Sequence, residues 1–191
     1  MQGLRVCARL ASKLPLRQQG RLLSSSSAAT KPSIQVQQER DRQDLNDFFP
    51  ELMENFREIL EPIKIPYETE WLVKAMEYNG RFLRWPGILN TYNTMRVLSP
   101  ESSPDYLRKA KLLAWAVEIA HIVFLVTDDI ADDGNMRWGK PVWWKLPEVG
   151  LNCVNDAFLM EGVMYQILKR EFGDNRHYVQ LFELFTHVRR R

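Results

Sequence analysis

The stretch WAVEIAHIVFLVTDDIADDG, residues 115–134, joins a long apolar segment to four aspartates and decides the fold. Its apolar residues recur at intervals of three and four, which is typical of an α-helix with one buried face. Upstream, Ser102 or Ser103 can cap the helix, and Pro104 suits its first turn. Gly134 can end the helix. The sequence therefore predicts one long core helix that begins near Pro104 and ends at the aspartates.

The rest of the chain also has helical patterning. Residues 151–172 carry apolar side chains at helical spacing and are followed by Gly173. Residues 45–60 have the same spacing, but Pro50 predicts a break in the helix or the start of a second one. Alternating strand patterns of useful length and internal repeats are absent from the sequence. We therefore expect an all-α bundle.

The N-terminal segment differs in charge from the rest of the chain. Residues 1–38 contain six basic residues and no acidic residue, and they include a serine run at 24–27. This composition is typical of a mitochondrial presequence. A disordered tail on a cytoplasmic protein is the alternative. The remainder, residues 39–191, is net acidic, which argues against a nucleic-acid partner. We expect a leader over 1–38 and a separate folded region over 39–191.

Three other kinds of structure find little support. The longest apolar run, near residues 122–126, is short compared with a bilayer, so we expect no transmembrane segment. The two cysteines, Cys7 and Cys153, lie far apart and predict no disulfide framework. The three histidines are not clustered at the spacing of a zinc site.

The aspartates at the end of the predicted helix need a physical reason. A carboxylate near a helix C-terminus faces the negative end of the helix dipole, which costs about 0.3–1 kcal/mol. Asp128 and Asp132 are four positions apart, and Asp129 is three before Asp132, so their carboxylates can share one face. Mg²⁺ prefers one or two carboxylates completed by water and phosphate oxygens. The pattern predicts a Mg²⁺ site, with a solvated acidic helix end as the alternative.

Three stretches together resemble a known enzyme family. They are WAVEIAHIVFLVTDDIAD at 115–132, MRWGKPVWW at 136–144 and VNDAFLMEGVMYQILK at 154–169. Residues 39–191 resemble the first, N-terminal half of the catalytic domain of farnesyl diphosphate synthase, an isoprenyl diphosphate synthase. The resemblance implies an all-α isoprenoid synthase fold and usually a homodimer. It also implies Mg²⁺ ions that draw off the diphosphate of an allylic prenyl substrate and so generate an allylic cation.

The resemblance assigns roles to individual residues of the chain. It makes Asp128 and Asp132 the metal ligands and Asp129 their neighbour at the catalytic centre. Arg137 would clamp the allylic diphosphate. Val123 and Phe124 would form the floor of the pocket that sets chain length, although ordinary core packing would explain both equally well.

The chain departs from the family pattern where the family binds its second substrate, isopentenyl diphosphate. The family uses a lysine, an arginine, a glutamine and a second arginine there. At these positions the chain has Arg84, Gly87, His121 and Trp138, so one cation remains. Loss of charge-assisted contacts of roughly 1.5–3 kcal/mol each weakens a diphosphate site. Arg84, His121 and Trp138 therefore stay as candidate substrate-binding residues of altered character.

These departures favour an enzyme that ionises one prenyl diphosphate, such as farnesyl diphosphate, to a terpene product. In this respect the chain resembles insect terpene synthases derived from farnesyl diphosphate synthases. A condensing prenyltransferase is the first alternative. A truncated, non-catalytic fragment is the second, because the sequence has no second aspartate-rich motif after residue 133.

Overall fold

Helix α6 (Pro104–Ala131) forms as the sequence predicts. In the computed structural model, the Ser103 hydroxyl caps it by accepting a hydrogen bond from the Tyr106 amide at 3.2 Å. At the other end Asp132 is the C-cap, and Asp133 adopts a left-handed conformation with φ of 50°. The Gly134 amide then donates to the Asp129 carbonyl at 2.8 Å and closes the turn.

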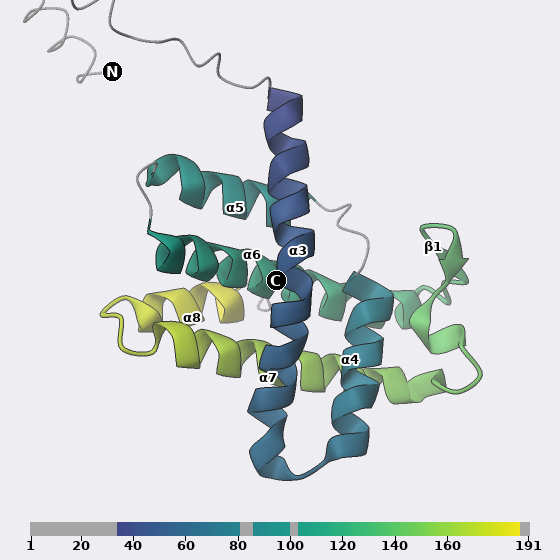
Figure 1. Cartoon of the computed structure of the whole chain (residues 1–191). Coiled ribbons are helices and arrows are strands. Elements are labelled where there is room, and N and C mark those ends of the chain that lie inside the picture. Colours follow the sequence, from purple (N-terminus) through teal and green to yellow (C-terminus); the bar gives the residue numbers. More distant parts are fainter. Residues whose placement is uncertain (1–33, 81–85, 100–102, 188–191) are drawn as a thin grey trace, which may run out of the picture. The chain divides into compact units, whose positions relative to one another are not determined.

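The structure describes residues 34–80, 86–99 and 103–187 (Figure 1). The chain divides into two units, residues 1–36 and 37–191, and the contacts that follow belong to the second. Besides α6, its α-helices over the described ranges are α3 (Ile34–Leu60), α4 (Pro66–Gly80), α5 (Pro86–Leu98), α7 (Cys153–Phe172) and α8 (Tyr178–His187). The short 3-10 helices are η1 (Glu61–Ile63), η2 (Trp143–Lys145) and η3 (Gly150–Asn152).

Helix α6 lies at the centre of the core. Its most extensive contacts are with α7 on one side and α5 on the other (Figure 1). It also packs against α3, because Trp115 lies 5.1 Å from the Phe49 ring and donates its indole N–H to the Leu45 carbonyl at 3.1 Å. Trp115, Ile119 and Ile122 are almost completely buried. This burial explains why a helix ending in unfavourable carboxylates is nevertheless stable.

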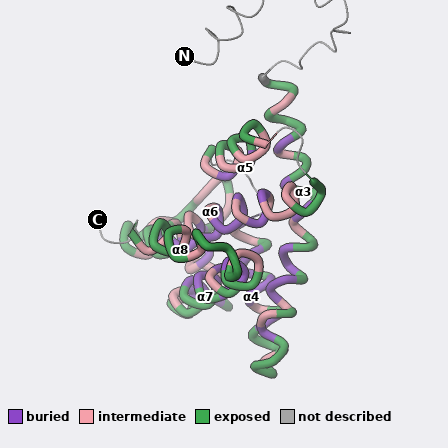
Figure 2. Tube along the Cα trace, turned by 90° about the vertical axis from the view of Figure 1, so that its left-hand side faces the viewer, coloured by how far each residue is buried: buried purple, intermediate pink, exposed green. Residues whose placement is uncertain are grey.

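The prediction of a break at Pro50 is wrong, because α3 continues through it as one helix. Proline inside a helix costs about 3 kcal/mol, since it removes one hydrogen bond and crowds the preceding turn. Figure 2 shows buried segments along α3, and its core residues on both sides of Pro50 include Leu45, Phe48, Leu52 and Phe56. Burying several large side chains at roughly 1.5–3 kcal/mol each outweighs the proline penalty.

Over the described ranges, a short β-hairpin is the one element that is not helical. Strand β1 (Met136–Arg137) pairs antiparallel with β2 (Lys140–Pro141), and Arg137 lies opposite Lys140. The connecting residues Trp138 and Gly139 have φ of 52° and 84°. Positive φ at both central positions matches a tight type I′ turn, whose twist suits a hairpin. Strands of two residues are too short to produce an alternating pattern, so the sequence did not predict them.

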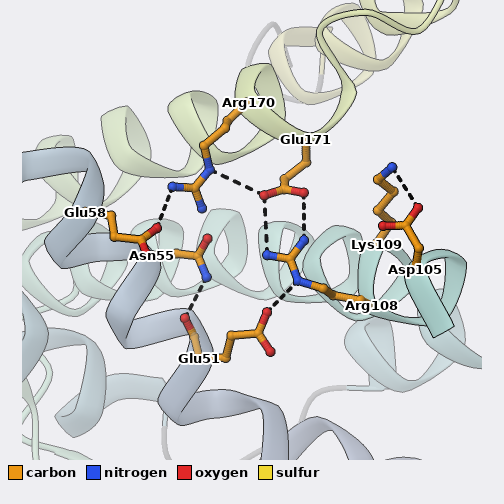
Figure 3. Close-up of polar contacts among 8 residues, drawn as sticks. All are labelled: Glu51, Asn55, Glu58, Asp105, Arg108, Lys109, Arg170 and Glu171. Carbon is orange, nitrogen blue, oxygen red and sulfur yellow. Dashed lines mark hydrogen bonds and ion pairs between the residues drawn. The ribbon is translucent and has the colours of Figure 1, made fainter.

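Charged side chains join three helices at their surface (Figure 3). Arg108 of α6 binds Glu51 of α3 at 2.6 Å and Glu171 of α7 at 2.8 Å. Arg170 of α7 binds Glu58 of α3 at 2.9 Å and lies 3.4 Å from Glu171. We call these five residues the three-helix charge network.

A buried carboxylate joins α4, η2 and α7. Asp156 accepts the indole N–H of Trp71 at 3.0 Å and that of Trp143 at 2.8 Å. Burial raises the pKa of Asp156, although both hydrogen bonds act in the opposite direction. Nearby, Cys153 is fully buried, and burial together with the charge of Asp156 raises the pKa of its thiol to about 11. Trp143 is 1% exposed and is thus a packing residue.

By length and composition, α6 is the one helix of the described residues that could cross a membrane. The core helix of a globular protein passes the same test, and 56% of the most apolar window of α6 is buried inside the protein. The absence of a transmembrane segment stays a prediction.

Candidate active site

The aspartates at the end of α6 have different surroundings. Asp128 and Asp132 are exposed, and the side chain of Asp128 retains 60% of its accessible surface. Asp129 is buried, with 10% of its side chain accessible. Asp133 is exposed and binds Lys145 at 2.8 Å. The helix therefore presents Asp128 and Asp132 outward and turns Asp129 inward.

Arg137 is held by Asp129. Its Nη2 donates to Oδ1 of Asp129 at 2.7 Å, and its Nε donates to Oδ1 and Oδ2 at 3.0 and 3.1 Å. Asp128 lies farther away, with its Oδ2 3.6 Å from Nη2. The hydrogen bond with Asp129 is the main cause of a raised pKa at Arg137, so this guanidinium stays charged. A bond of this kind fixes both the position and the orientation of the guanidinium plane.

The main chain of Asp129 anchors the segment that follows α6. Its carbonyl accepts the amide of Gly134 at 2.8 Å and the indole N–H of Trp144 at 2.9 Å. A Cβ atom at Gly134 would lie 3.2 Å from the Asp129 carboxylate and 3.3 Å from its carbonyl oxygen, so a side chain fits poorly there. Asp129 thus joins the helix end to the hairpin and to η2. The sequence prediction named Asp129 but not its contacts with Arg137 and Trp144.

The donor set of Asp128 and Asp132 fits Mg²⁺. Within residues 34–80, 86–99 and 103–187, no three acidic, histidine or cysteine side chains gather into a ready metal cage. Mg²⁺ does not need one, since it usually binds through one or two carboxylates with water and substrate phosphates in the remaining positions. Asp128 and Asp132 supply two exposed carboxylates for this purpose, while the Asp129 carboxylate forms an ion pair with Arg137.

An apolar groove of about 410 Å³ lies between α5, α6 and α8. Its described lining consists of Thr91, Leu113, Val117, Ala120, His121, Phe124, Leu181, Leu184 and Phe185. Phe124 also lines a neighbouring hollow of about 490 Å³ that contains Thr127, Asp128 and Ala131. Since a helix rises 1.5 Å per residue, His121 lies about 10 Å along α6 from Asp128. The groove and the hollow together place the Asp128 carboxylate at one end of an apolar surface.

The remaining predicted residues are distributed unevenly around this groove. Phe124 is 44% exposed and lines both the groove and the hollow, whereas Val123 is 5% exposed and belongs to the core. His121 lines the groove. Trp138 lies in the hairpin turn, where left-handed backbone is uncommon for a bulky residue. Arg84 lies outside the described residues, so its predicted role stays a prediction.

Glu118 lies behind His121 and was not a predicted site residue. It is 1% exposed, and its Oε1 is 3.8 Å from Nδ1 of His121. Its Oε2 is buried and has no hydrogen-bond partner among the described residues. The sequence could have placed Glu118 next to His121, since residues three positions apart on a helix share a face.

Comparisons with known proteins agree on one family. A family model described as polyprenyl synthetase matches residues 69–191. The farnesyl pyrophosphate synthase of Kluyveromyces lactis is 36% identical over 148 residues, which are 74% of this chain and 42% of that protein. That of Murgantia histrionica is 33% identical over 157 residues, 79% of this chain and 37% of the relative. The chain thus spans less than half the length of either relative.

The fold of a solved structure is similar as well. The crystal structure of T. brucei farnesyl diphosphate synthase matches with a TM-score of 0.66 and 24% identity, over 78% of this chain and 44% of that one. The predicted all-α isoprenoid synthase fold is confirmed for this part of it.

Proposed function

Because the chain belongs to the polyprenyl synthetase family, we propose that it supplies part of the active site of a Mg²⁺-dependent prenyltransferase. Such an enzyme condenses an allylic prenyl diphosphate with isopentenyl diphosphate. The observation that carries the proposal is the position of exposed Asp128 at one end of an apolar surface that continues past Phe124. A prenyl diphosphate has the matching form, with a charged head and a hydrocarbon tail.

Asp128 and Asp132 would hold Mg²⁺ against the diphosphate. When bound, the ion acts as a Lewis acid and template that stabilises the negative charge of the leaving diphosphate. Arg137 carries a fixed positive charge near Asp128, and Asp129 keeps it in place through two nitrogen atoms. The groove residues exclude water from the hydrocarbon chain, which favours transfer of the prenyl group over its hydrolysis.

The comparisons support condensation better than ionisation of a single substrate. Both relatives named above are farnesyl pyrophosphate synthases, and each matches most of this chain. The altered positions in the second diphosphate site favour the opposite order, and they are the reason that the sequence alone predicts ionisation of a single substrate.

A terpene synthase-like reaction is the second candidate, and particular residues favour it. His121 and Trp138 stand where the resemblance places a glutamine and an arginine that contact the second diphosphate. Gly87, in the first turn of α5, stands where it places another arginine. An enzyme with these replacements would ionise a prenyl diphosphate and release a hydrocarbon or an alcohol.

Product analysis separates the two reactions. The chain is incubated with Mg²⁺ and geranyl or farnesyl diphosphate, with and without isopentenyl diphosphate. A longer prenyl diphosphate that requires isopentenyl diphosphate supports condensation, whereas a hydrocarbon or alcohol formed without it supports the second candidate. D128A/D132A should abolish either product, while D133N is the matched control because Asp133 binds Lys145. No product and no Mg²⁺-dependent binding of either diphosphate would refute both for this chain.

We also propose that the protein forms a homodimer. Large apolar side chains stay exposed on α7 and α8 outside the groove, among them Phe158 at 62% and Val179 at 62%. Exposed apolar surface of this kind favours association. Sedimentation equilibrium tests the proposal, and a monomer across the micromolar range would refute it.

A further inference from the structure

One of the two candidate Mg²⁺ ligands lies where its helix ends. Asp128 belongs to the last regular turn of α6, whereas Asp132 is the C-cap, one residue beyond Ala131. The Asp132 amide still donates to the Asp128 carbonyl at 2.9 Å, which keeps the two residues one turn apart. The end of a helix frays easily, because its final carbonyls lack partners within the helix. The separation of the two carboxylates therefore depends on what holds this turn closed.

Trp144 holds the turn from outside the helix. Its indole N–H donates to the Asp129 carbonyl at 2.9 Å, although 15 positions separate the two residues. The same carbonyl accepts the Gly134 amide at 2.8 Å, so both of its lone pairs are used. Gly134 belongs to the turn itself, whereas Trp144 belongs to η2. The next residue of η2, Trp143, is 1% exposed and binds Asp156 of α7 at 2.8 Å, so the indole ties the turn to the core.

Asp129 links this turn to the cation of the site. While its carbonyl accepts the indole N–H of Trp144, its carboxylate binds two nitrogens of the Arg137 guanidinium, at 2.7 and 3.0 Å. Asp128 precedes it directly, and Asp132 follows within one turn. A displacement of Asp129 would therefore move the cation and both exposed carboxylates together.

An ion pair at the same turn is less suited to fix it. Lys145 lies 2.8 Å from Asp133, but 80% of the Asp133 side chain is accessible to solvent. Exposed ion pairs contribute little to stability and weaken in salt. The Lys145 ammonium also lies 3.9 Å from the centre of the Trp144 ring, so the indole supports this pair as well. The hydrogen bond of the half-buried Trp144 is uncharged and does not depend on salt in this way.

We propose that Trp144 is the positioning residue of the aspartate site, through its hydrogen bond to the main chain of Asp129. The inference rests on the proposed function, in which Asp128 and Asp132 hold Mg²⁺. Two carboxylates that already have the right separation lose less conformational entropy when they bind an ion. An indole is a hydrogen-bond donor only, so Trp144 acts through Asp129 and supplies no ligand of its own.

The experiment compares two substitutions of the same chemical kind. W144F removes the indole N–H that reaches the end of α6. W115F is the matched control, because the Trp115 indole also donates to a main-chain carbonyl, that of Leu45, at 3.1 Å. Trp115 lies about 20 Å along α6 from Asp128, since a helix rises 1.5 Å per residue. A third variant, Trp144→benzothienylalanine, has sulfur in place of the N–H and keeps the ring shape, so it removes the hydrogen bond even if W144F does not fold.

Two quantities are measured for each protein. The first is the Mg²⁺ concentration at half-saturation, from titration with Mg²⁺ at a fixed concentration of inorganic diphosphate. The second is the rate of amide hydrogen exchange, at residues 128–134 and in α7.

We expect both Trp144 variants to raise the half-saturating Mg²⁺ concentration about 3- to 10-fold, the factor that corresponds to one lost hydrogen bond. W115F should leave this concentration unchanged. Exchange at the Asp132 and Gly134 amides should accelerate in the Trp144 variants, while the amides of α7 keep their rates. A merely structural role would accelerate exchange in the core as well, because core amides exchange through unfolding of the whole unit.

The outcomes separate failure of this inference from failure of the proposed function. If the unaltered chain binds Mg²⁺ with diphosphate and W144F changes the half-saturating concentration no more than W115F, the inference is overturned and the proposed function stands. Accelerated exchange at residues 132–134 without a change in Mg²⁺ affinity also overturns it, because the carboxylates then do not depend on the turn. If the unaltered chain does not bind diphosphate with Mg²⁺, the proposed function fails and the inference falls with it.

Discussion

Neighbouring aspartates at the end of α6 have separate tasks because a helix turns by about a quarter circle at each residue. Asp128 faces the hollow next to Phe124, while Asp129 points into the protein and binds Arg137. Chemically identical side chains thus become a candidate metal ligand and an anchor. The sequence predicted the group of carboxylates and its Mg²⁺ chemistry, but it could not assign these tasks, since helix rotation relative to the hairpin depends on tertiary contacts.

The substitutions D129N and D128A should therefore affect different properties. D129N weakens a buried charge-assisted contact, so we expect the free energy of unfolding to fall by about 1.5–3 kcal/mol. D128A removes an exposed group and should leave it within about 0.5 kcal/mol, while abolishing Mg²⁺-dependent binding of diphosphate. Urea denaturation and isothermal titration with Mg²⁺ and inorganic diphosphate measure the two effects. Equal loss of stability in both variants would contradict the assignment.

The hairpin turn offers a test of backbone strain at single residues. Trp138 has φ of 52°, and a left-handed conformation costs an ordinary residue roughly 1–2 kcal/mol. Asparagine tolerates this conformation better, so W138N should raise the free energy of unfolding by about 1 kcal/mol. G139A, at φ of 84°, should lower it by a similar amount. Thermal unfolding would contradict this view if both substitutions were destabilising to the same degree.

Among the elements, the long periodic helix was the easiest to predict from sequence. The capping serine, the proline in the first turn and the closing glycine of α6 all act within a few residues, so the sequence contains the necessary information. The continuation of α3 through Pro50 was missed because the compensating contacts come from helices distant in sequence. The groove was missed for the same reason, since α8 contributes Leu181, Leu184 and Phe185 to a surface on α6.

The junction of α4, η2 and α7 should depend on pH through Asp156. A carboxyl group whose pKa is raised on folding binds its proton more tightly in the folded state. Its contribution to stability is therefore full at low pH and declines as pH rises from the ordinary aspartate value through the folded value.

D156N should reveal that dependence. An amide has one oxygen for the two indole N–H groups of Trp71 and Trp143, so we expect a loss of about 1–3 kcal/mol. The difference in free energy of unfolding between the unaltered chain and D156N should be largest at acid pH and shrink as pH rises. Urea denaturation from pH 3.5 to 8 measures it, and a difference that grows with pH would show that the sign is wrong.

In the folded unit, surface ion pairs join helices that also pack through the apolar core. The three-helix charge network joins α3, α6 and α7, which are separated widely along the chain (Figure 3). An exposed pair within one helix, such as Lys109 with Asp105, restrains only its own turn. A network that restrains several helices at once has more influence on folding cooperativity than its number of contacts suggests.

A double-mutant cycle can measure this difference. The cycle of R108M and E171Q should give a coupling free energy near 1 kcal/mol, at the upper end for partly exposed pairs. The cycle of K109M and D105N is the control and should give about 0.3–0.5 kcal/mol. Both should decrease in high salt. Coupling in the network no larger than in the control would mean that the three helices are held together by their apolar contacts alone.

Labelling of the buried Cys153 thiol can measure how often the start of α7 separates transiently from the core. It is fully buried, and its pKa of about 11 leaves little thiolate at neutral pH. In a chain with C7S, a thiol-labelling reagent can therefore react only when the start of α7 separates from the core. The labelling half-life would then measure how often this junction opens, and it should lengthen when a ligand holds the helices together.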